Sequence, residues 1–361
     1  MTMSMGDIRR LLRENGLYWL ILLALLLLPH ILGWLTSSSP FGTQRGARFI
    51  MSGQAVFWMS VAIEVFALAI MVMSYNLMFG FTGVISFGHA MFFGLGGYLV
   101  GMLLQYTQLD PNLAFLLGVL IVLAVCGVIG FVIGLVTLRL RGVYFAIFTL
   151  AIAEMVWIYF GRLSLTGGED GFTLGKMPAW IDPSQSRINL YYVALVLFVG
   201  TFILIRRLVK SPGGTVFMAI RENEERARAL GYHTLRYKLV AITIAAMMAG
   251  MAGIVHGVLA KKIGPEMLGV GYTVDALLMT IIGGTGTFTG PVIGAAGLEL
   301  ADTVFRDAKF TIGATTINIG DQWTLILGII FVVVVMVVPY GVVGTWTRLR
   351  LWVEKHFARP T

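Results

Sequence analysis

The chain has 361 residues, of which 58% are hydrophobic and 12% are charged, and its formal net charge at neutral pH is +8. Average soluble domains are about 45–50% apolar and about 25% charged, so this composition excludes an ordinary soluble globule and also a disordered chain. It argues against an outer-membrane β-barrel, in which apolar and polar residues alternate. We therefore predict an all-α polytopic membrane protein with a single transmembrane domain over residues 1–361.

Runs of about 20 apolar residues, the length that crosses a bilayer as a helix, predict eight full spans. The first run is expected to be retained as a span or signal anchor, because no clear cleavage site follows it. Two shorter apolar pieces, 272–283 and 291–304, are expected to form a helical hairpin or two short helices joined within the membrane. The full spans are expected near 17–35, 55–79, 84–105, 113–138, 142–160, 190–208, 238–260 and 322–344.

The distribution of Lys and Arg predicts the orientation of these spans. If the N-terminus lies in the cytoplasm, roughly two thirds of the 26 basic residues fall on the cytoplasmic side, as the positive-inside rule requires. Loop 206–238 and the C-terminus then also face the cytoplasm. Orientation therefore explains most of the positive charge. A nucleic-acid partner is not expected, since it would need basic residues clustered on a folded soluble surface.

A glycine-rich stretch over residues 75–98 carries polar side chains at membrane depth. Glycine inside a helix costs about 1 kcal/mol relative to alanine, and unwound backbone in a membrane is tolerated only where protein covers it or water lines it. The stretch is compatible with a broken helix that lines a solute path and, equally, with tight helix packing. For His89 we expect a structural hydrogen bond rather than contact with solute. The candidate path residues are Asn76, Thr82, Gly83, Ser86, Gly88, His89, Phe92 and Phe93.

A second glycine-rich break lies between the two short apolar pieces. Residues 283–290 hold glycine and threonine and are followed by proline, so we expect them to line the same path. The candidate residues of this break are Gly283, Gly284, Gly286, Gly290 and Pro291.

Two intramembrane acids, Glu64 and Glu154, lie near the middle of predicted spans. Charges at that depth cost about 2.5–3.5 kcal/mol even on insertion scales, so they are candidates for function. A proton relay, binding of a solute ammonium group and an interhelical hydrogen bond all remain open for them.

Residues 211–234 form the most informative predicted loop. Small and apolar residues at helical spacing predict one short amphipathic helix, which Gly231 ends, and two i,i+4 ion pairs, Glu222–Arg226 and Glu224–Arg228, support it. Such a helix can dock into a groove on a cytosolic partner, although a solvated connector is the alternative. The candidate contact residues are Ala219, Ile220, Arg221, Glu222, Asn223, Glu224, Arg226, Ala227, Leu230 and Gly231.

Motifs for catalysis or nucleotide binding are missing from the sequence. It contains no G-x-x-x-x-G-K-[ST], no H-E-x-x-H, no C-x-x-C and no G-x-S-x-G. We therefore expect neither enzyme activity nor ATP hydrolysis nor a metal site in this chain. Its one cysteine, Cys126, lies in an apolar run and is expected to serve packing.

The two glycine-rich stretches and loop 211–234 described above, with several shorter motifs, resemble the LivM-type permease subunits of branched-chain amino acid (hydrophobic amino acid uptake) ABC importers. The resemblance runs from about residue 70 to about residue 340, and loop 211–234 is its most specific part. It is carried by residues 76–77, 80–83, 86–90, 92–94, 138–142, 144–146, 166–168, 171, 211–214, 219–224, 227–231, 283–284, 286–287 and 290–295.

The resemblance implies a bacterial inner-membrane subunit, with both termini cytoplasmic, that forms half of a translocation path for branched-chain or related amino acids. It implies four kinds of partner: a LivH-like second permease, two cytosolic ATPase subunits, an extracytoplasmic substrate-binding protein and the lipid bilayer. ATP and Mg are then used by the ATPase subunits, with no cofactor in this chain. Residues 221–231 would be the coupling helix that lies in a groove of the ATPase.

Two other functions remain open at this stage. Related permeases of the same family carry urea or short amides, so the solute is not determined. A different class, an ion-coupled secondary transporter that uses Glu64 or Glu154, would not need ATPase partners.

Overall fold

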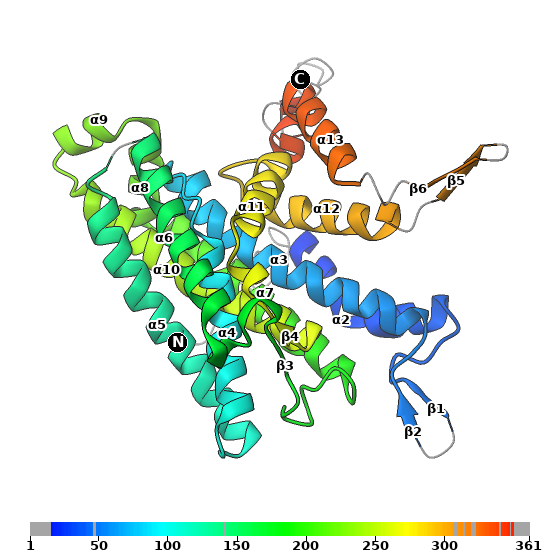
Figure 1. The fold of residues 1–361 in the computed structure, drawn as a ribbon. Helices are drawn as coiled ribbons and strands as arrows, with labels where there is room; N and C mark the ends of the chain where they lie inside the picture. Colours follow the sequence, from blue (N-terminus) through cyan, green and yellow to red (C-terminus); the bar gives the residue numbers. More distant parts are fainter. Residues whose placement is uncertain are drawn as a thin grey trace, which may run out of the picture.

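The computed structural model describes residues 16–45, 48–140, 142–306, 309–312, 315–318, 323–338, 341–346 and 348–349. Within these residues, six helices are long and apolar enough to cross a membrane, and the strands form three short antiparallel pairs. The prediction of an all-α membrane protein is confirmed (Figure 1). The N-terminal segment before Gly16, which is predicted to lie in the cytoplasm, falls outside the described residues.

The element bounds follow the predicted spans closely in most cases. The helices are α2 (Gly16–Leu35), α3 (Gln54–Thr82), α4 (Ala90–Tyr106), α5 (Pro111–Thr137), α6 (Val143–Arg162), α7 (Arg187–Lys210), α8 (Pro212–Glu222), α9 (Glu224–Ala229), α10 (Thr234–Ala260), α11 (Val270–Gly283), α12 (Gly290–Arg306) and α13 (Trp323–Val337). The strand pairs are β1 (Thr43–Arg45) with β2 (Arg48–Ile50), β3 (Phe172–Thr173) with β4 (Lys262–Ile263), and β5 (Lys309–Ile312) with β6 (Thr315–Asn318).

Two predicted spans have different bounds in the structure. The span expected over 84–105 begins only at Ala90, because the preceding residues form an irregular connection rather than a helix. Part of the segment expected to span over 322–344 forms α13, which ends at Val337. The short pieces on either side of the second break form α11 and α12, as predicted.

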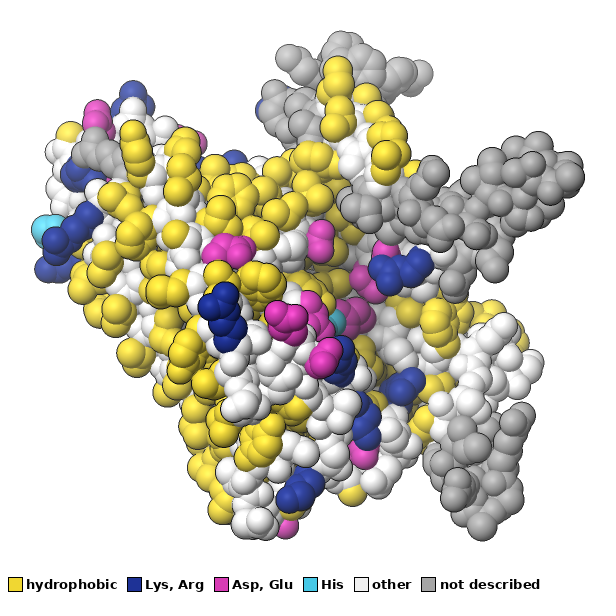
Figure 2. Space-filling model, in the orientation of Figure 1, with side chains coloured by type: hydrophobic (Ala, Val, Ile, Leu, Met, Phe, Trp, Pro, Cys, Tyr) yellow, Lys and Arg dark blue, Asp and Glu magenta, His cyan; other side chains and the backbone are white. Residues whose placement is uncertain are grey.

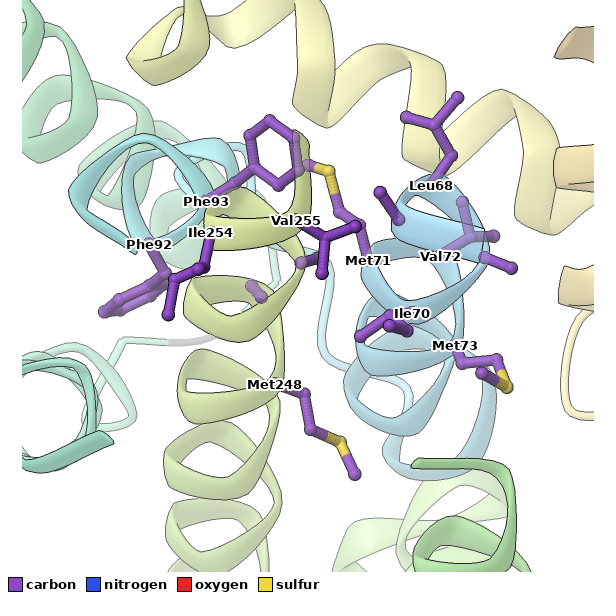
Figure 3. Close-up of a cluster of buried hydrophobic side chains, with 14 of the residues drawn as sticks. Leu68, Ile70, Met71, Val72, Met73, Phe92, Phe93, Met248, Ile254 and Val255 are labelled. Carbon is purple, nitrogen blue, oxygen red and sulfur yellow. The ribbon is translucent and has the colours of Figure 1, made fainter. Parts of the chain in front are cut away.

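Helices α3 and α10 form the centre of the molecule. In the most apolar 18-residue stretch of each of these two helices 67% is buried, far more than in the other spans. Helix α10 packs against α3, α4 and α5, while α3 also packs against α7 and α12. Figure 3 shows Met71 of α3 and Val255 of α10 among the buried side chains of this core, and Cys126 is buried too, as its apolar run predicts.

The outer helices present apolar side chains to their surroundings. In the most apolar 18-residue stretch of each helix, only 6% is buried in α2 and 22% in α6. Large exposed hydrophobic residues such as Leu20 and Ile147 lie on these helices, and Figure 2 shows hydrophobic side chains over much of one face. Such a surface is compatible with a lipid environment and not with water.

Glycines allow α4 and α10 to cross with their backbones in contact. A Cβ atom at Gly96 would lie 1.9 Å from the carbonyl oxygen of Gly250, and one at Gly253 would lie 1.7 Å from that of Phe93. Real Cβ atoms never approach backbone so closely, so the two helices would have to separate. Close packing of this kind is how small residues stabilise helix pairs in membranes.

We expect Gly253→Ala to lower the free energy of unfolding by about 1–3 kcal/mol, the usual cost of overpacking a tight core. Gly200→Ala is the matched control, because no atom of the residues that the structure describes lies within 4 Å of a Cβ atom at this glycine of α7. The control is expected to be neutral or slightly stabilising. Thermal unfolding of the two purified variants in detergent measures the difference, and equal melting temperatures would contradict the packing argument.

Candidate functional site

The first glycine break separates α3 from α4 as the sequence predicts. Helix α3 ends at Thr82, and Gly83 follows in the left-handed region with a φ of 73°, which glycine adopts without strain. Side chains of two other helices support the non-helical backbone beyond it: the Phe87 amide donates to Thr149 Oγ1 at 3.2 Å, and the Ala90 amide donates to Thr273 Oγ1 at 2.8 Å. These bonds explain why backbone can leave the helix here at membrane depth.

His89 lies in this break and makes a structural contact. Its Nε2 atom lies 2.7 Å from Ser74 Oγ of α3, and the residue is 1% exposed. The predicted structural hydrogen bond is therefore present, with Ser74 as the partner that the sequence did not indicate.

The second break is a compact turn between α11 and α12. Thr287 Oγ1 donates to the Gly284 carbonyl at 2.8 Å and accepts from the Gly290 amide at 3.0 Å. A Cβ atom at Gly283 would lie 1.9 Å from the Gly290 carbonyl, so the two ends of the turn are in contact. The break predicted at residues 283–290 is present, and α12 begins at its last glycine.

The two breaks meet, although about 200 residues separate them in the chain. Asn76 Oδ1 accepts from the Gly286 amide at 2.9 Å, and Asn76 Nδ2 donates to the Thr287 carbonyl, also at 2.9 Å. The rings of Phe81 and Phe288 pack beside this bridge with their centroids 5.7 Å apart. One buried amide thus holds the end of α3 to the turn between α11 and α12.

The loop predicted as one helix is in fact two. Helix α8 ends at Glu222, and Asn223 leaves helical geometry to cap α9, with its Oδ1 atom accepting from the Arg226 amide at 2.9 Å. Asparagine competes for backbone hydrogen bonds in this way, which explains the interruption. Gly231 has a φ of 90° and ends the segment as predicted.

The predicted apolar stripe of this loop is buried in part. Ile220 and Ala227 are buried beside Val216 in a small cluster of their own, as the spacing predicted. Leu230, expected on the same stripe, follows the last residue of α9 and is 72% exposed.

Glu224 is the electrostatic centre of this loop. It accepts from Lys238 Nζ at 2.6 Å, from Arg228 Nη2 at 2.7 Å and from the hydroxyl of Thr234 at 3.0 Å. Partial burial opposes ionisation, but these donors outweigh it and hold the pKa of Glu224 below its ordinary value. The predicted pair with Arg228 is confirmed, whereas the described residues show no ion pair between Glu222 and Arg226, since the helix ends between them.

We expect Glu224→Gln to increase amide hydrogen exchange in residues 211–234 at neutral pH, at a local cost of about 0.5–1 kcal/mol. The pKa is lowered in the folded state, so the stabilisation is complete above the ordinary glutamate pKa and is lost as pH falls through the lowered value. In the wild type, protection of these amides against exchange should thus fall only at acidic pH, and Glu224→Gln should lack this pH-dependent fall. Glu222→Gln is the control with no expected change; an equal effect in both variants would contradict the assignment.

Arg221 connects the loop to both breaks. Its Nη1 atom donates to the Gly80 carbonyl near the end of α3, and its Nη2 atom makes a longer contact of 3.4 Å with Thr285 Oγ1 in the second break. Its Cα atom lies 3.4 Å from the position of a Cβ at Gly83. We call this meeting point of α3, the turn 284–289 and α8 the junction.

A cavity of about 880 Å³ lies beside the junction. It is bounded by the first break, the connection between α5 and α6, helix α9 and the start of α10. Its wall includes Gly83, Phe87, Arg139, Asn223, Lys238 and Ile281. Open space therefore adjoins both the predicted path and the predicted loop.

The remaining candidate path residues are not all at the junction. Gly88 packs on α6, since a Cβ there would lie 2.4 Å from the Thr149 carbonyl, and the Ser86 hydroxyl accepts from the Gly88 amide at 3.2 Å. Thr82 bonds the Met78 carbonyl of its own helix. Phe92 and Phe93 are buried in the core of Figure 3, and Pro291 is buried at the start of α12. A path role for these residues stays a prediction.

Glu64 has a partner that the sequence did not indicate. Its Oε1 atom lies 2.6 Å from His256 Nδ1 of α10, and the hydroxyl of Tyr272 in α11 lies 3.3 Å from His256 Nε2. The side chains of His256 and Glu64 are 16% and 18% exposed. The chain of contacts joins three helices, so the interhelical hydrogen bond among the open alternatives is present. No partner of Glu154 occurs among the described residues.

Comparison with known proteins gives one family. Residues 57–341 match the family described as the permease component of branched-chain amino acid transport systems. Over 257 residues the chain is 31% identical to the high-affinity branched-chain amino acid transport system permease protein LivM of Salmonella typhimurium and 30% identical to that of Escherichia coli strain K12. Each match covers 64% of this chain and 60% of the relative, so the chain spans about 60% of the length of these curated relatives.

More distant similarities are also present. The chain is 28% identical over 165 residues to the autoinducer 2 import system permease protein LsrC of Photorhabdus laumondii, covering 40% of this chain and 49% of that one. A solved structure of a metal-chelate type ABC transporter in an inward-facing conformation shares 16% identity with a TM-score of 0.47, covering 88% of this chain and 99% of the other.

Proposed function

Because the chain belongs to the family of branched-chain amino acid transport permease components, we propose that it forms half of the translocation path of an ATP-driven importer for branched-chain or related amino acids. The single observation that supports this most is the family match over most of the chain. The contact between the loop and both glycine breaks is compatible with it, because such an importer must pass movement from a cytosolic motor to a membrane path.

The proposal assigns loop 211–234 to contact with a cytosolic ATPase subunit. Glu222, Asn223, Arg226 and Leu230 are exposed on α8 and α9, and Figure 2 shows charged side chains gathered at this end of the molecule. An exposed pair of short helices anchored by a buried cluster fits a groove on a partner. Arg221 and Glu224 are instead used within this chain, so we propose that they shape the loop rather than contact the ATPase.

The remaining partners and the orientation follow from the same proposal. One further LivH-like permease would complete the path, two ATPase subunits would hydrolyse ATP with Mg, and an extracytoplasmic binding protein would deliver the solute. The distribution of Lys and Arg supports cytoplasmic termini in a bacterial inner membrane. We further propose that residues 1–361 act as a single transmembrane domain, with 211–234 as the coupling loop within it.

The solute is proposed only as a class. A relative at 28% identity is named for import of autoinducer 2, so similarity at this level extends across solutes. Urea or short amides remain alternatives within the same kind of importer. Ligand screening of the binding protein that works with this chain would identify the solute.

Reconstitution tests the proposed function. The chain is placed in proteoliposomes alone and together with a second permease, the ATPase subunits and a loaded binding protein. We expect uptake of labelled leucine only in the complete complex and only with ATP. Uptake by the chain alone under a proton or sodium gradient would instead support the secondary transporter and overturn the proposal.

A further inference from the structure

We propose that Arg221 is the positioning residue through which a movement of loop 211–234 reaches both glycine breaks. The inference rests on the proposed function, because it names the residue that passes the motor's movement to the path. Its evidence is the geometry of the junction.

Helix α8 holds Arg221 firmly in relation to the rest of the loop. The helix begins with Ser211, whose hydroxyl accepts from the Gly214 amide, followed by Pro212 in the first turn. Phe217 and Ile220 anchor it, being 2% and 3% exposed. A displacement of α8 must therefore carry the backbone of Arg221 with it.

The guanidinium bonds an acceptor that its own helix leaves free. The Gly80 carbonyl would accept from the amide four residues later in a continuous helix, but the Val84 amide instead donates to the Met78 carbonyl at 3.2 Å. Arg221 Nη1 supplies the missing donor. A cation at the C-terminal end of a helix also interacts favourably with the helix dipole.

The same guanidinium reaches the second break. Its other nitrogen contacts Thr285 Oγ1, and a Cβ atom at Gly286 would lie 2.2 Å from Nη1, so the guanidinium lies directly against the backbone of the turn. Among the described residues, Arg221 makes all the side-chain hydrogen bonds that join loop 211–234 to the two breaks.

The chemistry of arginine suits this position. A guanidinium presents five donors in a rigid planar fork, so it can bond acceptors on two elements at once, whereas the lysine ammonium is a single point charge on a flexible stem. Asn76 ties the two breaks directly to each other. Arg221 therefore acts on a unit that is already linked, and moving it shifts both breaks together.

The experiment uses the complete complex in proteoliposomes and measures leucine taken up per ATP hydrolysed. For Arg221→Gln we expect normal assembly with the ATPase subunits and at least a tenfold fall in this ratio. Arg221→Lys should restore less than half of the wild-type ratio, because it keeps the charge but not the fork. Arg236→Gln, an exposed arginine outside the junction, should match the wild type.

A second variant keeps the test decisive if Arg221→Gln assembles poorly. Thr285→Val removes one acceptor and should lower the ratio about two- to fivefold, and adding Arg221→Lys should lower it no further than Arg221→Lys alone. A ratio within twofold of wild type in Arg221→Gln, or full rescue by lysine, would overturn the inference. If the wild-type complex itself shows no ATP-driven uptake, the proposed function fails instead.

Discussion

Asn76→Ala is expected to be among the most destabilising single changes in the chain. Asn76 is 2% exposed, and its removal leaves the Gly286 amide and the Thr287 carbonyl without their partner. Each buried group left unsatisfied costs about 1–3 kcal/mol, so the free energy of unfolding should fall by roughly 2–6 kcal/mol. Thermal unfolding in detergent, followed by circular dichroism, measures the change.

Thr82→Val is the matched control for this variant. Thr82 is equally buried on the same helix, but among the described residues its hydroxyl bonds only the Met78 carbonyl of its own helix. Its replacement should cost no more than about 1 kcal/mol. Equal melting temperatures for the two variants would show that the Asn76 bridge does not hold the breaks together.

His256→Ala is expected to have an effect of similar size for an electrostatic reason. It leaves the Glu64 carboxylate, which is 18% exposed, without its partner inside the bundle. Breaking a buried pair from one side costs about 3–5 kcal/mol, and the slight exposure of both side chains places the expected loss near the lower end. Unfolding of the purified variant by heat in detergent provides the measurement.

The double variant shows whether charge is the cause. Glu64→Gln combined with His256→Ala leaves no unpaired carboxylate, so it should recover a large part of the stability lost in His256→Ala. Glu154→Gln should change the melting temperature little, since Glu154 has no partner among the described residues. The single variants Glu64→Gln and His256→Ala each lose some stability. If the loss in the double variant equals the sum of these two losses, the ion pair is not the explanation.

Local features of the fold were predictable from the sequence because their causes are local. Apolar runs of span length produced α2, α3, α5, α6, α7 and α10 within a few residues of the expected bounds. The glycines of the two breaks interrupt helices where predicted, and Gly231 ends the helical part of loop 211–234. In each case the covalent structure of the residue or the hydrophobicity of its neighbours decides the outcome.

The interruption at Asn223 shows where local reasoning becomes ambiguous. Periodicity favoured one continuous helix, and capping by the asparagine side chain favoured two. Burial of Ile220 and Ala227 beside Tyr237 of α10 is compatible with the second arrangement. The start of α4 at Ala90 was missed because Thr149 and Thr273, which lie on other helices, accept hydrogen bonds from the amides of Phe87 and Ala90.

The sequence alone determined that this chain crosses a membrane, where its two glycine breaks lie and which loop is a candidate for contact with a motor. Only the tertiary structure decided which of these features touch: Asn76 with the second break, Arg221 with both breaks, and Glu64 with His256. The physical reason is that such contacts depend on how helices are rotated and shifted relative to one another. That arrangement follows from packing over the whole bundle, such as the glycine crossing of α4 and α10, and local periodicity does not contain it.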